Sequence, residues 1–197
     1  MINMIFKGAL ALVFLLFWNS YGFAQNKVQS VTNISFGSYQ ESHGADQVNG
    51  TMLSIGYKHF FTEQWAYFVK LGNGSATGEY VSANGSIVGL KSSRTSLSGG
   101  ILWRYLFDAN PNLIPYIGAG MSIQHYTYDF DHVESEIGAT SGTGYGPVLM
   151  AGARIEISKR FTIIPGYQYE QIIIKSESGE QQALISSGLL LALVMGF

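Results

Sequence analysis

One histidine of the chain stands where a hydrolytic site could be built. His125 and Thr127 lie two residues apart in the stretch IQHYTYDFDH, and Glu134 and Glu136 follow shortly after them. A histidine that activates a hydroxyl, while a carboxylate orients its ring, is the arrangement of nucleophilic hydrolases. The hydroxyl belongs here to a threonine where a serine is expected, and pairs of this kind often arise by chance. We therefore expect no catalytic site and no enzymatic activity.

Acidic residues form the second group with potential chemistry. The run DFDHVESE at 129–136 holds four carboxylates, and oxygen ligands at alternate positions can bind a hard cation such as calcium. A calcium loop also needs a glycine turn at a fixed spacing, and the run contains none. We expect a solvated acidic surface, with no metal and no cofactor.

The composition excludes other classes of function. The 197 residues include no cysteine, which removes zinc–thiolate sites, disulfides and thiol nucleophiles. A formal net charge of -2 gives no attraction for nucleic acid. The 24 glycines, 12 tyrosines and 12 phenylalanines favour close-packed β-sheet over helix.

The first residues predict export. Lys7 precedes the apolar run GALALVFLLFW, which is too short to span a membrane as a helix. Gly22 and Ala24 then occupy the two positions that a signal peptidase reads. We expect a cleavable signal peptide at 1–24 and a single domain at 25–197.

The rest of the chain alternates between apolar and polar residues. This period predicts eight strands, at 29–39, 52–61, 65–76, 93–107, 115–128, 146–157, 161–174 and 184–197. Short turns follow Phe61, Phe107 and Ile157, whereas longer polar segments lie at 40–51, 77–92, 129–145 and 175–183. Short turns at one end and long loops at the other are typical of an all-β, eight-stranded antiparallel up-and-down transmembrane β-barrel. Nine acidic residues lie in or beside the long loops: Glu41, Asp46, Glu79, Asp129, Asp131, Glu134, Glu136, Glu177 and Glu180.

Side-chain parity separates two faces of these strands. One face is apolar and ends beside the short turns in aromatic residues, which we expect to form the periplasmic girdle at the membrane boundary: Trp65, Tyr67, Trp103, Tyr105, Phe107 and Phe161. The other face should line the lumen, with six charged residues: Lys58, Lys70, Arg104, Arg154, Glu156 and Glu170. In a narrow barrel these groups should pair and close the bore. Four cations face two carboxylates in this set. The excess could be explained by trapped water, by partners that we have assigned wrongly, or by a weak leak that prefers anions.

The final strand carries the clearest family features. Leu191, Leu193, Met195 and Phe197 share one face of the stretch SSGLLLALVMGF. Together with the expected signal peptide, the eight strands, PYIGAGMS at 115–122 and ARIEISKRFTIIPGYQY at 153–169, this strand resembles the small outer-membrane β-barrel proteins of the OmpA and OmpX type. The resemblance covers essentially the whole chain from residue 25.

The resemblance implies a location and a class of function. It places the protein in the bacterial outer membrane, among lipids and lipopolysaccharide, with those four C-terminal residues resembling the signal read by the outer-membrane assembly machinery. The function we expect is that of a non-catalytic barrel whose four acidic and polar surface loops serve envelope integrity, or adhesion through an extracellular ligand. Two alternatives stay open: a small low-conductance pore, and a lipid A-modifying enzyme built around His125, because such enzymes also use eight strands.

Overall fold

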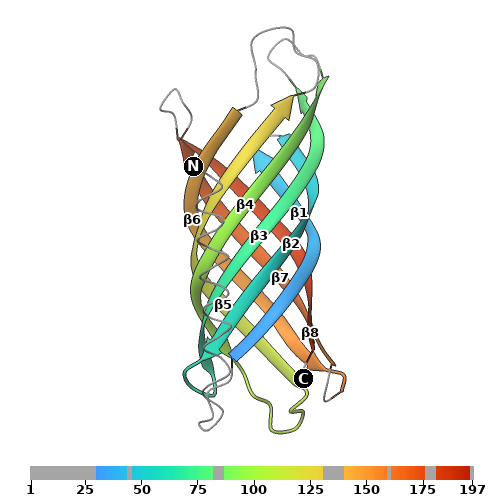
Figure 1. Cartoon of the computed structure of the whole chain (residues 1–197), viewed down its shortest axis with the longest axis vertical. Coiled ribbons are helices and arrows are strands. Elements are labelled where there is room, and N and C mark those ends of the chain that lie inside the picture. Colours follow the sequence, from blue (N-terminus) through green and yellow to red (C-terminus); the bar gives the residue numbers. More distant parts are fainter. Residues whose placement is uncertain are drawn as a thin grey trace.

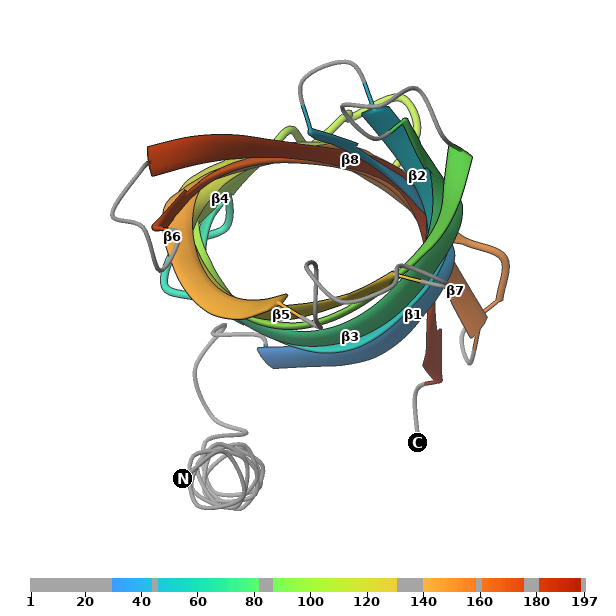
Figure 2. The same ribbon diagram turned by 90° about the horizontal axis from the view of Figure 1, so that it is seen from above.

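The chain folds into a closed barrel of eight strands (Figures 1 and 2). The computed structural model describes residues 30–43, 46–81, 87–130, 140–158, 161–175 and 181–195. Each strand pairs antiparallel with the next, and the last pairs antiparallel with the first. The strands are β1 Ser30–His43, β2 Asp46–Phe60, β3 Trp65–Val81, β4 Ile87–Arg104, β5 Leu113–Phe130, β6 Thr140–Glu156, β7 Phe161–Lys175 and β8 Gln181–Met195. The predicted fold class is therefore confirmed, whereas the expected signal peptide lies outside the described residues.

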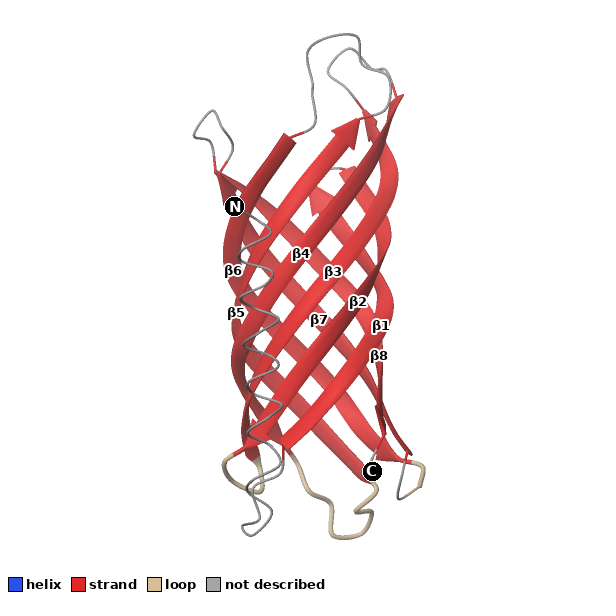
Figure 3. Ribbon diagram, viewed as in Figure 1, coloured by secondary structure: helices blue, strands red, loops and turns tan. Residues whose placement is uncertain are grey.

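Strands joined by turns and loops make up the described chain (Figure 3). Within it, no helix is both long and apolar enough to cross a membrane. In two of the turns at one end, a side chain accepts a hydrogen bond from the backbone. Thr62 Oγ1 accepts a hydrogen bond from Trp65 N at 2.9 Å, and Ser158 Oγ accepts one from Phe161 N at 3.2 Å.

The strands are longer than the sequence pattern predicted. Most of the residues assigned to the four long loops continue the ladders instead, so that β1 and β2 stay paired up to His43 and Asp46, and β3 and β4 up to Val81 and Ile87. The reason is that the ladder needs only a neighbouring backbone, while the apolar alternation used for prediction ends where lipid ends. At the other end the expected strand 93–107 stops at Arg104, so Tyr105 and Phe107 belong to the following loop.

The outward face has two zones along the barrel axis. A belt of exposed aliphatic and aromatic side chains encircles the part nearer the short turns, including Ile34, Phe36, Ile117, Met121 and Leu189. Beyond the belt most outward residues are polar, with Ser38, Thr51, Ser75, Ser93 and Thr143 exposed, although Ile87 at the outer end of β4 is exposed as well. An apolar belt around the outside of a barrel is typical of a surface that faces lipid.

The lumen is filled with side chains. One buried apolar cluster lies toward the polar zone and includes Tyr39, Met52, Tyr126, Tyr128 and Ile172. A second includes Phe60, Phe68, Leu102 and Val148, with Tyr116 and Met150 packed against it. Buried polar and charged residues also line the interior, as expected for eight strands, which enclose just enough space for side chains.

Tyr116 shows why the barrel needs inward glycines. Its hydroxyl lies so close to β6 and β7 that a Cβ added to Gly152 would meet it at 2.7 Å, and one added to Gly166 would meet it at 2.8 Å. The missing side chains on two adjacent strands make room for the ring. A large inward residue is therefore accommodated by small inward residues on the neighbouring strands.

Candidate functional site

A buried ion cluster crosses the lumen between β1, β4 and β7. Arg94 Nη1 lies 3.5 Å from Glu41 Oε1 and 3.5 Å from Glu170 Oε2. All three side chains are at most 2% exposed. The guanidinium also stacks on the Tyr39 ring, with Cζ 3.9 Å from its centroid. One arginine thus bridges two carboxylates in a place that water cannot screen.

Hydrogen bonds from neighbouring strands complete this cluster. Gln124 Nε2 donates to Glu170 Oε2 at 2.7 Å, and Ser92 Oγ donates to Glu41 Oε2 at 3.2 Å. Arg94 Nη1 donates to Ser186 Oγ at 2.6 Å. We define the buried ion cluster as Glu41, Arg94 and Glu170, on β1, β4 and β7. Its hydrogen-bond partners on other strands lie on β5 and β8, and Met52 on β2 also contacts Arg94. The cluster and its partners therefore connect six of the eight strands. Charges held by several bonds each are rigid, which suits a structural cross-brace.

Two cluster members were missed by the sequence analysis. Glu41 was assigned to a loop, but it is 1% exposed inside the barrel. Arg94 fell at the edge of a predicted strand and was not placed in the lumen. The alternation of side chains could have placed both residues in the lumen, since Glu41 shares the face of Ser35 and Arg94 shares the face of Ser98. For Glu41 the error was to stop the alternation at the predicted loop boundary, whereas Arg94 lay inside the predicted strand 93–107 and was not assigned to a face.

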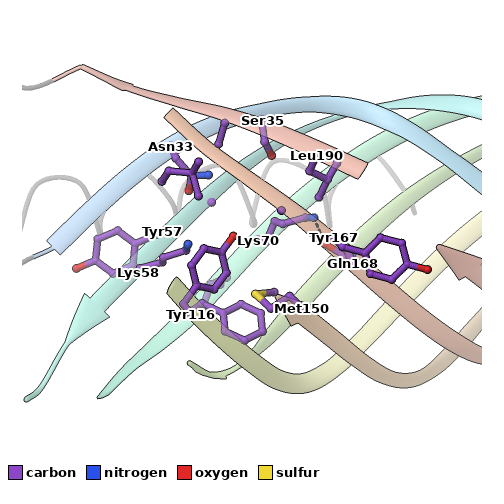
Figure 4. A pocket seen from close by; sticks show the side chains of 16 residues that line it. Asn33, Ser35, Tyr57, Lys58, Lys70, Tyr116, Met150, Tyr167, Gln168 and Leu190 are labelled. Atoms are coloured by element: carbon purple, nitrogen blue, oxygen red, sulfur yellow. Dashed lines mark hydrogen bonds between the residues drawn. The ribbon is translucent and has the colours of Figure 1, made fainter. Parts of the chain in front are cut away.

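The predicted lumen residues occupy inward positions of their strands, but they pair differently from the expectation. Glu170 meets Arg94, not one of the four expected cations. Lys70 Nζ donates to Gln168 Oε1, and Lys58 Nζ lies 4.3 Å from the centroid of the Tyr116 ring (Figure 4).

The remaining three residues of that set lie toward the short-turn end. Arg154 Nη2 and Glu156 Oε1 form a partly exposed ion pair at 2.7 Å. Arg104 Nε donates to the backbone oxygen of Glu63 at 2.7 Å, and its Cζ lies 3.8 Å from the centroid of the Phe60 ring. The six residues therefore do not form a single network.

The expected girdle residues all lie near the short turns. Trp65 and Trp103 are directly opposite each other in the β3–β4 ladder. The Trp103 and Tyr105 rings are 6.0 Å apart, and the Tyr105 and Phe107 rings are 4.7 Å apart. Tyr67 on β3 and Phe161 on β7 are also exposed. These positions form a row of aromatic rings at one edge of the apolar belt.

The predicted assembly residues are described only in part. Leu191 and Leu193 point outward from β8 and are 50% and 58% exposed. Met195 is the last residue of β8, opposite Phe161 in the ladder, and Phe197 lies outside the described residues.

The candidate hydrolytic residues are only partly brought together. His125 Nδ1 lies 3.3 Å from Thr143 Oγ1 across the β5–β6 ladder, whereas Thr127 stands opposite Ser141. Glu134 and Glu136 lie outside the described residues, as does most of the run 129–136. Within the described part of the chain, no three His, Asp or Glu side chains gather in a way that could hold a metal.

Known proteins share this architecture. Neisserial surface protein A matches with a TM-score of 0.62 at 12% identity, covering 87% of this chain and 100% of that one. Ail, the attachment invasion locus protein of Yersinia pestis, solved in complex with the heparin analogue sucrose octasulfate, matches with a TM-score of 0.54 at 15% identity, covering 86% and 99%. At such identities the likeness concerns the fold. No curated protein sequence gives a significant match.

The family model for the outer membrane protein beta-barrel domain matches residues 9–194. That span includes nearly all of the eight strands, with their lipid-facing belt and filled lumen. The chain belongs to the outer membrane protein beta-barrel domain family and is a protein of the bacterial outer membrane.

Proposed function

We propose that this protein is a non-catalytic surface protein, whose barrel presents a polar outer end for envelope integrity or adhesion. The observation that carries the proposal is the continuation of the strands beyond the apolar belt. There the outward residues change from aliphatic to hydroxyl, amide and charged side chains, including Asn49, Ser75, Lys91 and Asp129. A sheet that rises above the hydrocarbon layer offers a rigid polar surface to lipopolysaccharide headgroups and to anything outside the cell.

The filled lumen supports an anchor over a transport path. The buried ion cluster and the two apolar clusters occupy the bore, and each would have to move before a solute could pass. The protein's partners in this proposal are outer-membrane lipids and lipopolysaccharide around the belt and the polar zone. The outer-membrane assembly machinery is a further proposed partner, through the outward leucines of β8.

Binding measurements test the adhesion branch. The chain from residue 25 is placed in lipid nanodiscs, and binding is measured to lipopolysaccharide vesicles and to an immobilised sulfated polysaccharide, a probe chosen because Ail was solved with a heparin analogue. Variants replace 82–86, 131–139 or 176–180 with short Gly-Ser turns. We expect at least one replacement to abolish binding while the barrel stays folded. Binding that survives all three replacements, and that a barrel of unrelated outer-end sequence shows equally, would contradict the adhesion branch.

A deletion strain tests the envelope branch. Loss of the protein should raise sensitivity to detergent and to large antibiotics, and the wild-type gene should restore resistance. The His125→Ala gene should restore it equally, because the proposed role uses no catalysis. Mass spectrometry of lipid A from the same strains addresses the enzyme alternative: acyl chains that disappear with the wild-type gene and stay with His125→Ala would replace our proposal with a lipid A hydrolase.

A further inference from the structure

The charges inside the barrel do not balance at Lys58. In the buried ion cluster two carboxylates face one arginine, so the cluster carries one negative charge, which offsets the positive charge of the buried Lys70. At the short-turn end Arg154 has Glu156, and Arg104 has the Glu63 carbonyl. Lys58 has no carboxylate within ion-pair distance in the described chain and rests on the face of Tyr116. The Lys58 ammonium therefore lies in the lumen without a negative charge beside it among the described residues.

A cavity lies beside this cation. It is lined by Asn33, Lys58, Lys70, Tyr116 and Gln168, among others, and it has about 50 Å³ of free volume (Figure 4). One water-sized species needs roughly 10–15 Å³ of such volume, so the cavity can hold an occupant with some water. Met150, Ile164 and Leu190 contribute apolar wall to the same cavity.

The polar atoms of the cavity are mostly donors. Each lysine ammonium carries three N–H groups, and Lys70 uses one of them on Gln168. Gln168 is 4% exposed, and its Nε2 has no hydrogen-bond partner. An amide nitrogen left without an acceptor in the interior costs free energy, and so does an ammonium without a counter-charge. Asn33 Oδ1 is the one buried acceptor at this cavity that lacks a partner, and a water or an ammonium N–H can satisfy it.

A second, smaller cavity of about 20 Å³ shares Lys58 and Tyr116 with the first. Arg104 and Arg154 line it, together with Phe60, Leu102 and Ile114. Three cations, Lys58, Arg104 and Arg154, therefore line this smaller cavity. A group of cations attracts anions and repels other cations.

We propose that the lumen contains a binding site for one small monovalent anion of the halide class, held between Lys58, Lys70 and Gln168. A single negative charge neutralises the Lys58 ammonium, whereas a divalent oxyanion would place a second negative charge beside it at a larger desolvation cost. The small volume favours an ion of about the size of water. The anion acts as a structural counter-ion for Lys58 and does not depend on the proposed surface function.

Bromide locates the site directly. Crystals of the barrel are soaked in sodium bromide, and anomalous scattering is measured for the wild type, for Lys58→Met and for Lys91→Met. We expect a bromide peak within hydrogen-bonding distance of the Lys58 ammonium in the wild type and in Lys91→Met, whose lysine is an exposed strand residue outside the cavity. The peak should be lost in Lys58→Met. A lumen without a peak in the wild type would overturn the proposal, and this result needs no variant to fold.

Stability in solution gives the second readout. A ligand that binds only the folded state raises the unfolding midpoint until the site is saturated. The urea midpoint of the wild type should therefore shift upward in sodium chloride relative to sodium gluconate at the same ionic strength. Lys58→Met should lose that shift and Lys91→Met should keep it. Equal midpoints in both salts for the wild type would contradict a halide site.

Discussion

At the scale of single residues, the barrel depends on a few charges that are buried together. Arg94 lies between two glutamates, and Tyr39 covers its guanidinium. Burying an ion pair gains little over apolar packing, but removing one partner leaves the other charge without compensation. The arrangement thus makes each member costly to lose, although it says little about net stabilisation.

Replacing Arg94 with methionine should destabilise the barrel strongly. The change leaves Glu41 and Glu170 facing each other with only Lys70 nearby, and an uncompensated buried charge typically costs about 3–5 kcal/mol. Equilibrium unfolding in urea, in lipid vesicles, measures the loss. The difference in unfolding free energy between the wild type and Arg94→Met should become smaller as the pH is lowered, because protonation of either carboxylate removes the repulsion between them.

Arg154→Met is the matched control for that experiment. Arg154 and Glu156 form an ion pair that is 20% and 35% exposed, and an exposed pair contributes about 0–1 kcal/mol. A loss in Arg94→Met no greater than in Arg154→Met would show that the cluster is not a cross-brace. Glu170→Ala should also destabilise the barrel, but by less than Arg94→Met, because Arg94 keeps Glu41.

At the scale of the elements, β4 and β5 approach each other through glycine. Gly100 and Gly120 are directly opposite each other in the ladder, and a Cβ on Gly120 would lie 2.8 Å from the Cα of Gly100. No side chain fits there without moving a strand backbone. The pair therefore sets how tightly these two strands curve around the lumen.

Gly120→Val should consequently impair closure of the barrel. Overpacking of this kind costs about 1–3 kcal/mol, and valine's preference for strands cannot offset a clash with backbone. The urea midpoint and the heat-dependent shift on a gel both report the change. Ala119→Val is the control, since Ala119 is the adjacent, exposed, outward-facing residue of the same strand. Equal stability of the two variants would refute the close-approach argument.

The aromatic row at the edge of the belt makes a prediction of its own. In the chain from residue 25 the tryptophans are Trp65 and Trp103. If these rings lie at the membrane–water boundary, bromine atoms near the headgroup end of the lipid chains should quench their fluorescence most. In Trp103→Phe the remaining fluorescence comes from Trp65, and in Trp65→Phe it comes from Trp103, so the quenching of each ring can be measured alone. Strongest quenching by bromines at the chain ends would place the rings in the middle of the bilayer instead and remove the girdle.

At the scale of the whole molecule, the filled lumen predicts a closed barrel. Eight strands leave room only for side chains, and open porins need about 16 strands. The purified protein should show no stable conductance in planar bilayers, measured against a porin incorporated under the same conditions. Reproducible single-channel steps, with an ion selectivity that changes in Lys70→Ala or Arg104→Ala, would establish a pore.

The sequence by itself determined the fold class and the two faces of nearly every strand. Both follow from period-two alternation, which is a local property of the sequence. The alternation is easy to detect here because one face of each strand contacts lipid and the other packs in the lumen. It placed Lys58, Lys70 and Glu170 on the inward face for this reason. It failed at Glu41, because beyond the apolar belt the outward residues become polar, and the apolar outward face that was used to recognise a strand ends there.

Only the tertiary structure decided which inward charges meet. Glu41, Arg94 and Glu170 come from strands that are not neighbours in the barrel, so no register between adjacent strands brings them together. Their contact depends on how far each strand is staggered when the sheet closes, and on long side chains that cross the lumen. The same closure leaves Lys58 beside a cavity without a carboxylate. The alternation of side chains tells which face of the strand a residue lies on. Which residues from distant strands lie at the same level along the barrel axis is decided only when the barrel closes.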